Sequence, residues 1–177
     1  MLHALEGVEI RHMWYVIWTS TGSEERVARA VKEMTCQNRC FVPKRIVQIR
    51  KDGDWHYAQK NMFPGYFFVD SDDIEELSVQ LRKVEGFSTV LTVDKKFYPL
   101  TEKDNELTED LYNNGGIFDI SKGIIEGDSI IVTSGRLKGQ EGLIRKIDRH
   151  KRLAYLEFSM FDQVIRGTVG LEIVEKK

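Results

Sequence analysis

The chain has 177 residues, which is enough for one medium-sized domain or two small ones. Hydrophobic residues make up 41% of it and charged residues 31%, a composition typical of a soluble globular protein. The sequence has neither an apolar run of about 18 residues nor an apolar N-terminal signal, so we expect a cytoplasmic protein with no membrane segment.

The net charge of −2 is unevenly divided along the chain. Residues up to Gly123 contain 16 Lys and Arg against 20 Asp and Glu, whereas residues from Ile124 onward contain 10 against 8. The balance therefore changes from −4 to +2. This asymmetry predicts different partners for the two parts of the chain.

Neither a metal site nor an active site is indicated. The cysteines lie four residues apart, but no second pair of ligands follows at metal-binding spacing, so we expect reduced thiols. The nucleophile-elbow, phosphate-loop and dinucleotide-binding motifs are all missing, so we expect no enzymatic activity and no cofactor. The isolated ligand candidates are Cys36, Cys40, His3, His12, His56 and His150.

The first part of the chain mixes strand and helix patterns, which predicts an α+β domain. Residues 1–12 carry no periodic pattern, and we interpret them as an extension or tag, with Met13 as a candidate start. Helices are expected after Ser23, over residues 74–84 with Ser71 or Asp72 as the cap, and after Thr101. Strands are expected at residues 14–18, 41–49, 55–60, 66–69 and 89–93.

The second part of the chain has a different pattern. Asn113-Asn114-Gly115-Gly116 ends the last helix, and residues 113–123 are the best linker candidate. Five short strands then follow, which predicts a small β-barrel. We therefore expect an N-terminal domain at 13–112, a linker at 113–123 that leaves the two domains semi-independent, and a C-terminal domain at 124–177. The expected strands are 129–133, 141–147, 153–158, 164–168 and 171–174.

Aromatic strands in the first part are apolar on both faces. Because alternate side chains of a strand point in opposite directions, Tyr66 and Phe68 share one face and Phe67 and Val69 the other. The same alternation places Trp14, Val16 and Trp18 opposite Tyr15 and Ile17. Helices can cover one such face. The second face is either buried as well or exposed as a surface for a partner.

A basic segment marks the second part. Residues 145–152 contain five Lys or Arg and one acidic residue, and they span a predicted turn between strands. This segment is either a solvated hairpin tip or a surface that binds phosphates. If it binds RNA, base-paired RNA is the better target, because no aromatic residue for stacking is interleaved with the charges. The candidate RNA-binding residues are Arg136, Lys138, Arg145, Lys146, Arg149, His150, Lys151 and Arg152.

These segments resemble a known family. Trp14-Tyr-Val, then a helix, then Phe63-Pro-Gly-Tyr-Phe-Phe-Val69 resembles the N-terminal domain of NusG-type transcription elongation factors. Ile125-Glu-Gly-Asp-Ser-Ile-Ile-Val132, Ser134 to Gly142 and the basic hairpin resemble a KOW domain. The resemblance covers residues 13–177. It implies an N-terminal sheet flanked by helices, linked to a five-stranded SH3-like barrel.

The resemblance also implies partners. In this family the N-terminal domain docks on the clamp helices of RNA polymerase and favours the pause-resistant enzyme, while the KOW domain recruits a small-subunit ribosomal protein, the Rho factor or RNA. The protein is expected to act as a monomer. By similarity, the polymerase-binding residues are Trp18, Phe63, Tyr66 and Phe68.

Two features depart from an ordinary NusG. The KOW hairpin is strongly basic, and Phe161-Asp162-Gln163 stands where Phe-Gly-Arg is usual. These departures resemble the specialised LoaP group, which promotes processive antitermination in long bacterial operons and binds a leader RNA hairpin. The alternatives are a housekeeping NusG that recruits a ribosomal protein or Rho, and an RNA-binding KOW protein with no polymerase role. The alternating Ile, Val and Leu residues of the C-terminal part predict strands rather than the helical hairpin of fold-switching relatives.

Overall fold

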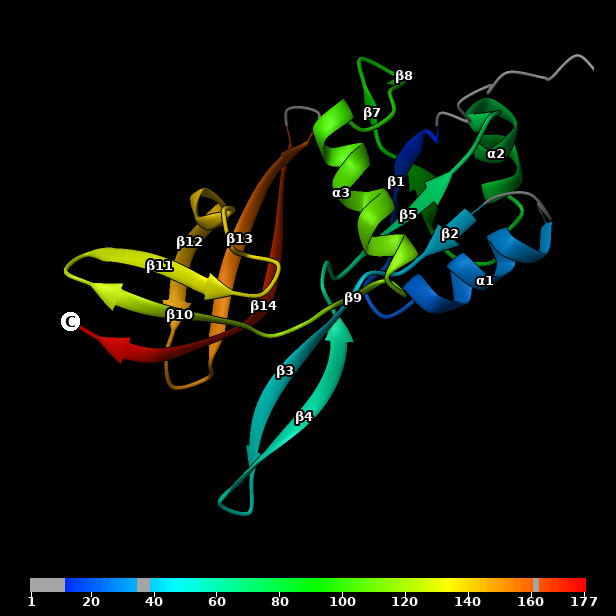
Figure 1. Cartoon of the computed structure of the whole chain (residues 1–177). Coiled ribbons are helices and arrows are strands. Elements are labelled where there is room, and N and C mark those ends of the chain that lie inside the picture. Colours follow the sequence, from blue (N-terminus) through cyan, green and yellow to red (C-terminus); the bar gives the residue numbers. More distant parts are fainter. Residues whose placement is uncertain (1–11, 35–38, 161–162) are drawn as a thin grey trace, which may run out of the picture.

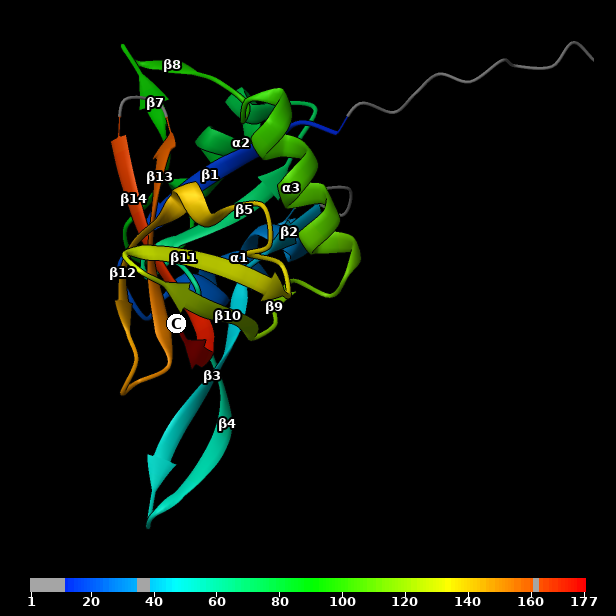
Figure 2. The ribbon, with the colours of Figure 1, turned by 60° about the vertical axis from the view of Figure 1, so that its left-hand side comes forward.

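The computed structural model describes residues 12–34, 39–160 and 163–177. An α/β part and a β-barrel lie side by side, and the tip of one long hairpin extends beyond both (Figures 1 and 2). This mixed architecture confirms the predicted α+β class with a small five-stranded barrel. Among the described helices, none is long and apolar enough to cross a membrane.

The N-terminal part is built on an antiparallel four-stranded sheet in the order β2-β5-β1-β6. The predicted strands at 14–18 and 66–69 are its two central strands, which pair with Trp14 opposite Asp70 and Trp18 opposite Tyr66. The apolar sequences at its centre explain why this sheet needs cover on both faces. Its strands are β1 (Trp14–Thr19), β2 (Arg39–Phe41), β5 (Tyr66–Asp70) and β6 (Ser88–Val90).

Three α-helices lie within the described residues, each where the sequence predicts one. They are α1 (Glu24–Met34), α2 (Ile74–Leu81) and α3 (Glu102–Asn113). The predicted cap of α3 is confirmed, because Thr101 Oγ1 accepts a hydrogen bond from the Asp104 backbone N–H. The predicted cap of α2 is wrong by one or two residues, since Asp73 accepts from Glu76 N–H at 2.9 Å.

The strand predicted over residues 41–49 is interrupted. Proline has no N–H to offer a sheet ladder, and the break falls at Val42 and Pro43. The Pro43 carbonyl instead accepts from Met62 N–H at 2.8 Å. The chain therefore leaves the first sheet after β2 and enters a second, three-stranded sheet in the order β4-β3-β9.

The second sheet carries the projecting hairpin. It consists of β3 (Lys44–Lys51) and β4 (Asp54–Asn61), which pair along their whole length. Asp52 and Gly53 both have positive φ, at 53° and 93°, which is the conformation of the tight turn that an Asp-Gly pair favours. The strand predicted at residues 55–60 is thus confirmed as the second strand of this hairpin.

Residues 89–93 also form two strands rather than one. β6 ends at Val90, and β7 (Thr92–Val93) pairs with β8 (Lys96–Phe97) in a separate small hairpin. Leu91 between them still donates its N–H to the Val16 carbonyl at 2.9 Å. This hairpin lies at the opposite end of the molecule from β3–β4 (Figure 1).

The C-terminal barrel has five strands in the order β11-β10-β14-β13-β12. The segments predicted as strands 164–168 and 171–174 are one long strand, because it pairs first with β13 and then with β10. Residues 141–143 are a 3₁₀ turn, and β10 begins inside the expected linker. The strands are β10 (Ser121–Glu126), β11 (Ser129–Ser134), β12 (Ile144–Asp148), β13 (Leu153–Met160) and β14 (Gln163–Lys176).

The connection between the two parts is bound to the N-terminal part, unlike the free linker that the sequence predicts. β9 (Ile117–Phe118) pairs in parallel with the start of β3. Lys44 N–H donates to the Gly116 carbonyl at 2.8 Å. Gly116 has φ of 73°, and a Cβ there would lie 2.9 Å from the Phe41 ring, so this position requires glycine.

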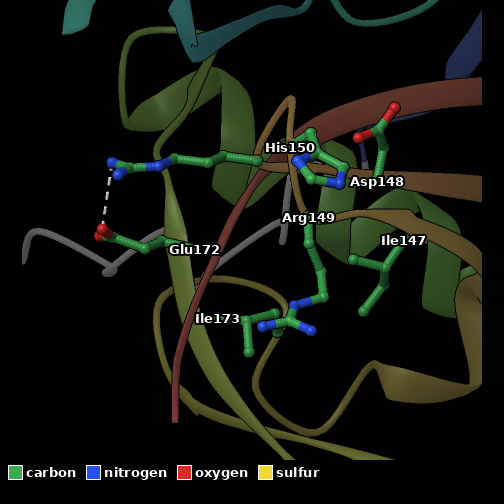
Figure 3. Close-up of a pocket in the computed structure, with 7 residues that line it drawn as sticks. Ile147, Asp148, Arg149, His150, Glu172 and Ile173 are labelled. Atoms are coloured by element: carbon green, nitrogen blue, oxygen red, sulfur yellow. Dashed lines mark ion pairs between the residues drawn. The ribbon is translucent and has the colours of Figure 1, made fainter. Parts of the chain in front are cut away.

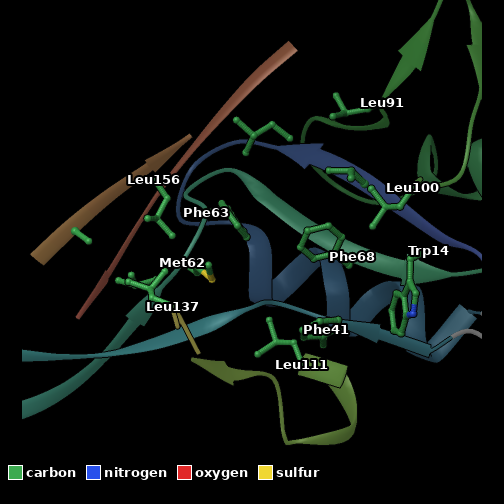
Figure 4. Close-up of a cluster of buried hydrophobic side chains, with 14 of the residues drawn as sticks. Trp14, Phe41, Met62, Phe63, Phe68, Leu91, Leu100, Leu111, Leu137 and Leu156 are labelled. Carbon is green, nitrogen blue, oxygen red and sulfur yellow. The ribbon is translucent and has the colours of Figure 1, made fainter. Parts of the chain in front are cut away.

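The two faces of the first sheet have different covers. Tyr15, Ile17, Phe67 and Val69 pack in one cluster with residues of α1 and α2. Trp14, Val16 and Phe68 belong to a second cluster that also holds residues of α3 and the barrel. The predicted alternation is confirmed, and Figure 4 shows the second cluster, with Leu137 and Leu156 of the barrel near Phe63 and Phe68.

Candidate functional site

The turn at residues 63–66 is fixed by a buried carboxylate. Gly65 has φ of 87°, and Tyr66 N–H donates to the Phe63 carbonyl at 3.0 Å. Glu24 at the start of α1 is 1% exposed, and its oxygens accept from the N–H groups of Gly65 at 2.6 Å and Gly22 at 2.7 Å. Glu24 therefore sets the direction in which the aromatic side chains leave this turn.

Two of the candidate polymerase-binding residues lie under the barrel. Phe63 and Phe68 are each 4% exposed. The Phe63 ring meets Phe158 of β13 edge to face at 5.2 Å, and it meets Phe68 in the same way at 6.0 Å. A Cβ on Gly167 of β14 would stand 2.7 Å from the Phe63 ring, so the barrel backbone approaches this ring as closely as glycine permits. The sequence predicts that the second face of the sheet is either buried or exposed for a partner. At Phe63 and Phe68 it is buried.

A cleft of about 340 Å³ opens beside this contact, between α3 and the barrel. Its walls include Leu107 of α3, which is 42% exposed. Leu111, one turn later, is 9% exposed. The contact between the two parts is thus apolar but not fully closed on the α3 side.

The other two candidate polymerase-binding residues reach solvent. Trp18 is 46% exposed, and Tyr66 opposite it is half-buried. Trp18 packs edge to face on Phe87 at 5.0 Å, and Phe87 is itself 51% exposed. Exposed aromatic pairs of this kind are common anchors of protein interfaces. No spacing pattern in the sequence points to Phe87.

The basic segment ends in an exposed turn between β12 and β13. Asp148 accepts from Lys151 N–H at 2.9 Å, and the next residue, Arg152, has φ of 52°. Arg149, His150 and Lys151 are exposed at this turn. Figure 3 shows the Arg149 side chain extending toward Ile173, beside an open hollow of about 660 Å³.

Arg152, in contrast, is engaged between the two parts of the molecule. Its Nη1 donates to Gln48 Oε1 of β3 at 2.7 Å and lies 3.1 Å from Glu172, an ion pair marked in Figure 3. The guanidinium lies 4.1 Å from the ring centre of Trp55 on β4. Arg152 therefore helps to hold the hairpin β3–β4 against the barrel.

The remaining candidate cations differ in availability. Arg136 pairs with Asp110 of α3, which is a second link between the parts. Arg145 pairs with Glu157 at 3.3 Å, and Lys146 lies 5.7 Å from the Tyr155 ring centre. Lys138 is exposed. Lys138, Arg145 and Lys146 are thus exposed away from the turn, while Arg136 and Arg152 face the N-terminal part.

Comparison with known proteins agrees with this architecture. Residues 12–108 match the model of the family described as transcription termination factor NusG, and residues 126–165 match the KOW motif. The chain belongs to the NusG family.

The NusG relatives match over most of their length. The chain is 27% identical to the transcription termination/antitermination protein NusG of Campylobacter jejuni, over 93% of this chain and 97% of that protein. It is 30% identical to the protein of that name from Streptococcus pyogenes, over 78% of this chain and 82% of that one. A solved structure described as domain interaction in Thermotoga maritima NusG aligns with a TM-score of 0.49 and 22% identity, over 91% of this chain and 94% of that chain.

Within this NusG fold, the structure adds residues that the basic segment alone does not reveal. Trp55 and Tyr57 of β4 lie almost a hundred residues before the basic turn, yet Trp55 stacks under Arg152. The expectation that no aromatic residue accompanies the charges is therefore wrong for the folded chain. The aromatic residues of the hairpin are visible in the sequence. Their separation from the basic turn along the chain gives no indication that Trp55 lies beside Arg152.

The cysteines fall outside these surfaces. Cys40 on β2 is fully buried, and burial raises the pKa of its thiol to about 12, so it is unreactive at neutral pH. Cys36 lies outside the described residues, as do Phe161 and Asp162, on which part of the comparison with LoaP rests.

Proposed function

We propose that this chain is a LoaP-like processive antitermination factor. Its N-terminal domain, residues 13–112, would bind the clamp helices of RNA polymerase through Trp18, Phe63, Tyr66 and Phe68. Its KOW domain, residues 124–177, would bind a leader RNA hairpin through the basic turn. The observation that carries the RNA assignment is the exposed turn at Arg149, His150 and Lys151, which concentrates positive charge in an otherwise acidic chain.

The cover over Phe63 gives this function an order of events. Trp18 and Tyr66 are accessible at once, whereas Phe63 and Phe68 become accessible only when the barrel moves away. Full docking on polymerase therefore costs the free energy of the barrel contact. Binding to polymerase and packing of the barrel exclude each other at Phe63.

The test is transcription in vitro through an intrinsic terminator, with and without a leader RNA hairpin upstream. Wild-type chain should increase read-through when the leader is present. If three to five cations contact phosphates, the logarithm of the RNA association constant should fall with that of salt at a slope of about −2 to −5. The full-length variant Arg149→Glu/Lys151→Glu should flatten this slope and lose read-through while it still binds polymerase. Read-through by this variant at the wild-type level would refute the RNA-guided function.

A housekeeping role is the second candidate, favoured by the similarity to proteins named NusG over most of their length. In that role the KOW domain would recruit a ribosomal protein or Rho, and the leader RNA would have no effect on read-through. A polymerase-independent RNA-binding protein would fail to co-purify with polymerase. The transcription assay and a polymerase pull-down therefore separate the three functions.

A further inference from the structure

A basic cleft lies between the hairpin β3–β4 and the turn that joins β12 to β13. Its volume is about 260 Å³, and it is lined from both parts of the molecule. Its walls contain Arg45, Arg50 and Lys60 from the hairpin and His150 and Lys151 from the turn, with no acidic residue among them. Five cationic or titratable basic groups facing one space repel each other, so this cleft favours an anion.

Arg45 provides an independent indication of a ligand. Its Nε donates to the Asn61 carbonyl at 3.2 Å, but its Nη1 is buried and has no hydrogen-bond partner within the described residues. Burial also lowers the pKa of this guanidinium. A buried cation is costly, and an anion in the adjoining cleft would offset the charge of this guanidinium.

An aromatic surface adjoins the cleft. Tyr57 is directly opposite Gln48 across the hairpin, and Trp55 is two residues further along the same face. Gln48 Nε2 donates to Tyr57 Oη at 3.5 Å, and Gln48 Oε1 accepts from Arg152. Tyr57 is 72% exposed, so its ring is available to stack with a base.

We propose that the hairpin β3–β4 and the basic turn form one composite RNA-binding surface. In it Arg50 and Lys60 contact the phosphate backbone and Tyr57 stacks on an unpaired base. This inference rests on the proposed RNA-guided function and changes its target, from base-paired RNA alone to a stem with unpaired nucleotides beside it. Cations interleaved with an aromatic ring are the combination that binds unpaired nucleotides.

The composite surface belongs to the closed arrangement of the two domains. The hairpin reaches the turn through Arg152 and Gln48, and the barrel contacts Phe63 in the same arrangement. Docking of polymerase on Phe63 would separate the two halves of the surface. The hairpin therefore contributes to RNA capture before docking, and the KOW turn alone retains the RNA afterwards.

The phosphate contacts are tested on the full-length chain, with a labelled RNA stem-loop as the probe over a series of salt concentrations. The variant Arg50→Glu/Lys60→Glu should bind about 10-fold more weakly or worse, and the salt slope should decrease in magnitude by about 2, close to one per lost phosphate contact. The matched control is Lys83→Glu/Lys96→Glu, an equal charge change at exposed positions that do not line the cleft. It should change the slope far less.

The stacking contact is tested with Tyr57→Ala and Tyr57→Phe. The alanine variant should lose about 5- to 100-fold in affinity for the stem-loop, the range for an aromatic residue that stacks on a base. Its affinity for a fully paired RNA of the same stem should stay at the wild-type value, and Tyr57→Phe should bind like wild type. Tyr98→Ala, at another exposed tyrosine, is the control.

The outcomes separate this inference from the function on which it rests. If Arg149→Glu/Lys151→Glu abolishes binding while the hairpin variants behave like their controls, the turn alone binds RNA and the composite surface is refuted. If wild-type chain binds no RNA at low salt, the proposed function is refuted together with it. Equal affinity for a DNA stem-loop of the same sequence would show a general polyanion site and overturn the assignment to RNA.

Discussion

The two faces of the first sheet are equally apolar in sequence but differ in what covers them. One face is covered by α1 and α2, which are joined to the sheet by short connections. The other is covered partly by α3 and partly by the barrel, which lies much later in the chain. An apolar strand face requires cover. Under the proposed function only the helix cover is permanent, and the barrel-covered face is also offered to polymerase.

The largest expected effect is on the helix-covered face. Phe67 is 0% exposed there, and Phe67→Ala should lower the free energy of unfolding by about 3–5 kcal/mol, because it leaves a cavity under two helices. Urea denaturation followed by circular dichroism measures this change. The control Val79→Ala, on the exposed side of α2, should stay within about 0.5 kcal/mol of wild type. A small loss for Phe67→Ala would mean that this face is no more permanent than the other.

The next effect concerns the barrel-covered face. Gly167→Val places side-chain atoms against the Phe63 ring and the Met62 carbonyl, so it should cost about 1–3 kcal/mol of domain contact. The barrel should then separate, and polymerase affinity should rise as Phe63 becomes accessible. The barrel amides should show faster tumbling in NMR relaxation.

Gly142→Val is the matched control for Gly167→Val, since a Cβ at Gly142 meets nothing within 4 Å. It should leave both tumbling and polymerase affinity at their wild-type values. Wild-type tumbling in Gly167→Val, with an intact barrel spectrum, would contradict the idea that the barrel is a removable cover.

A third prediction concerns the exposed margin of the same sheet. Trp18→Ala should weaken polymerase binding by about 1–2 kcal/mol if Trp18 anchors the interface. The free energy of unfolding should change less than for Phe67→Ala, because Trp18 is 46% exposed. Titration with purified polymerase gives the affinity, and Tyr98→Ala serves as a surface control. Unchanged affinity would remove Trp18 from the proposed interface.

The sequence predicts local features of this chain better than distant contacts. Alternation in residues 14–18 and 66–69 is enough to separate the two faces, and Thr101 is recognisable as a cap. Which element covers a face depends on contacts between residues far apart, such as Phe63 with Phe158. No local pattern encodes such a contact.

The candidate site shows the same limit. Clustered charge identifies the turn at Arg149 and Lys151, which is a local feature. The sequence does not show that Arg152 points to the hairpin, or that Trp55 borders the turn, because the break at Pro43 redirects the chain into a second sheet. The glycines read as a flexible linker also have a different role, since Gly116 is needed for close packing against Phe41.

The smallest expected effect is a pH dependence at α3. This helix is the cover that the N-terminal domain itself provides for part of the second face. Glu109 accepts from Trp14 Nε1 at 2.8 Å and from both terminal nitrogens of Arg39 at 3.1 and 2.8 Å. Burial alone would raise the pKa of Glu109, but the hydrogen bonds from Arg39 and Trp14 outweigh it and hold the pKa below its ordinary value. Its carboxylate therefore ties α3 to the sheet.

Because the pKa of Glu109 is lower in the folded state, its contribution is complete above the ordinary pKa of glutamate and is lost as pH falls through the lowered value. Glu109→Gln should cost on the order of 1 kcal/mol at neutral pH, since a partly exposed pair is screened by solvent. In urea denaturation over an acidic pH series, the difference between this variant and wild type should shrink toward low pH. Glu106→Gln, on the exposed side of the same helix, should run parallel to wild type. A difference that stays constant down to the lowest pH would show that packing, not charge, holds α3 on this face.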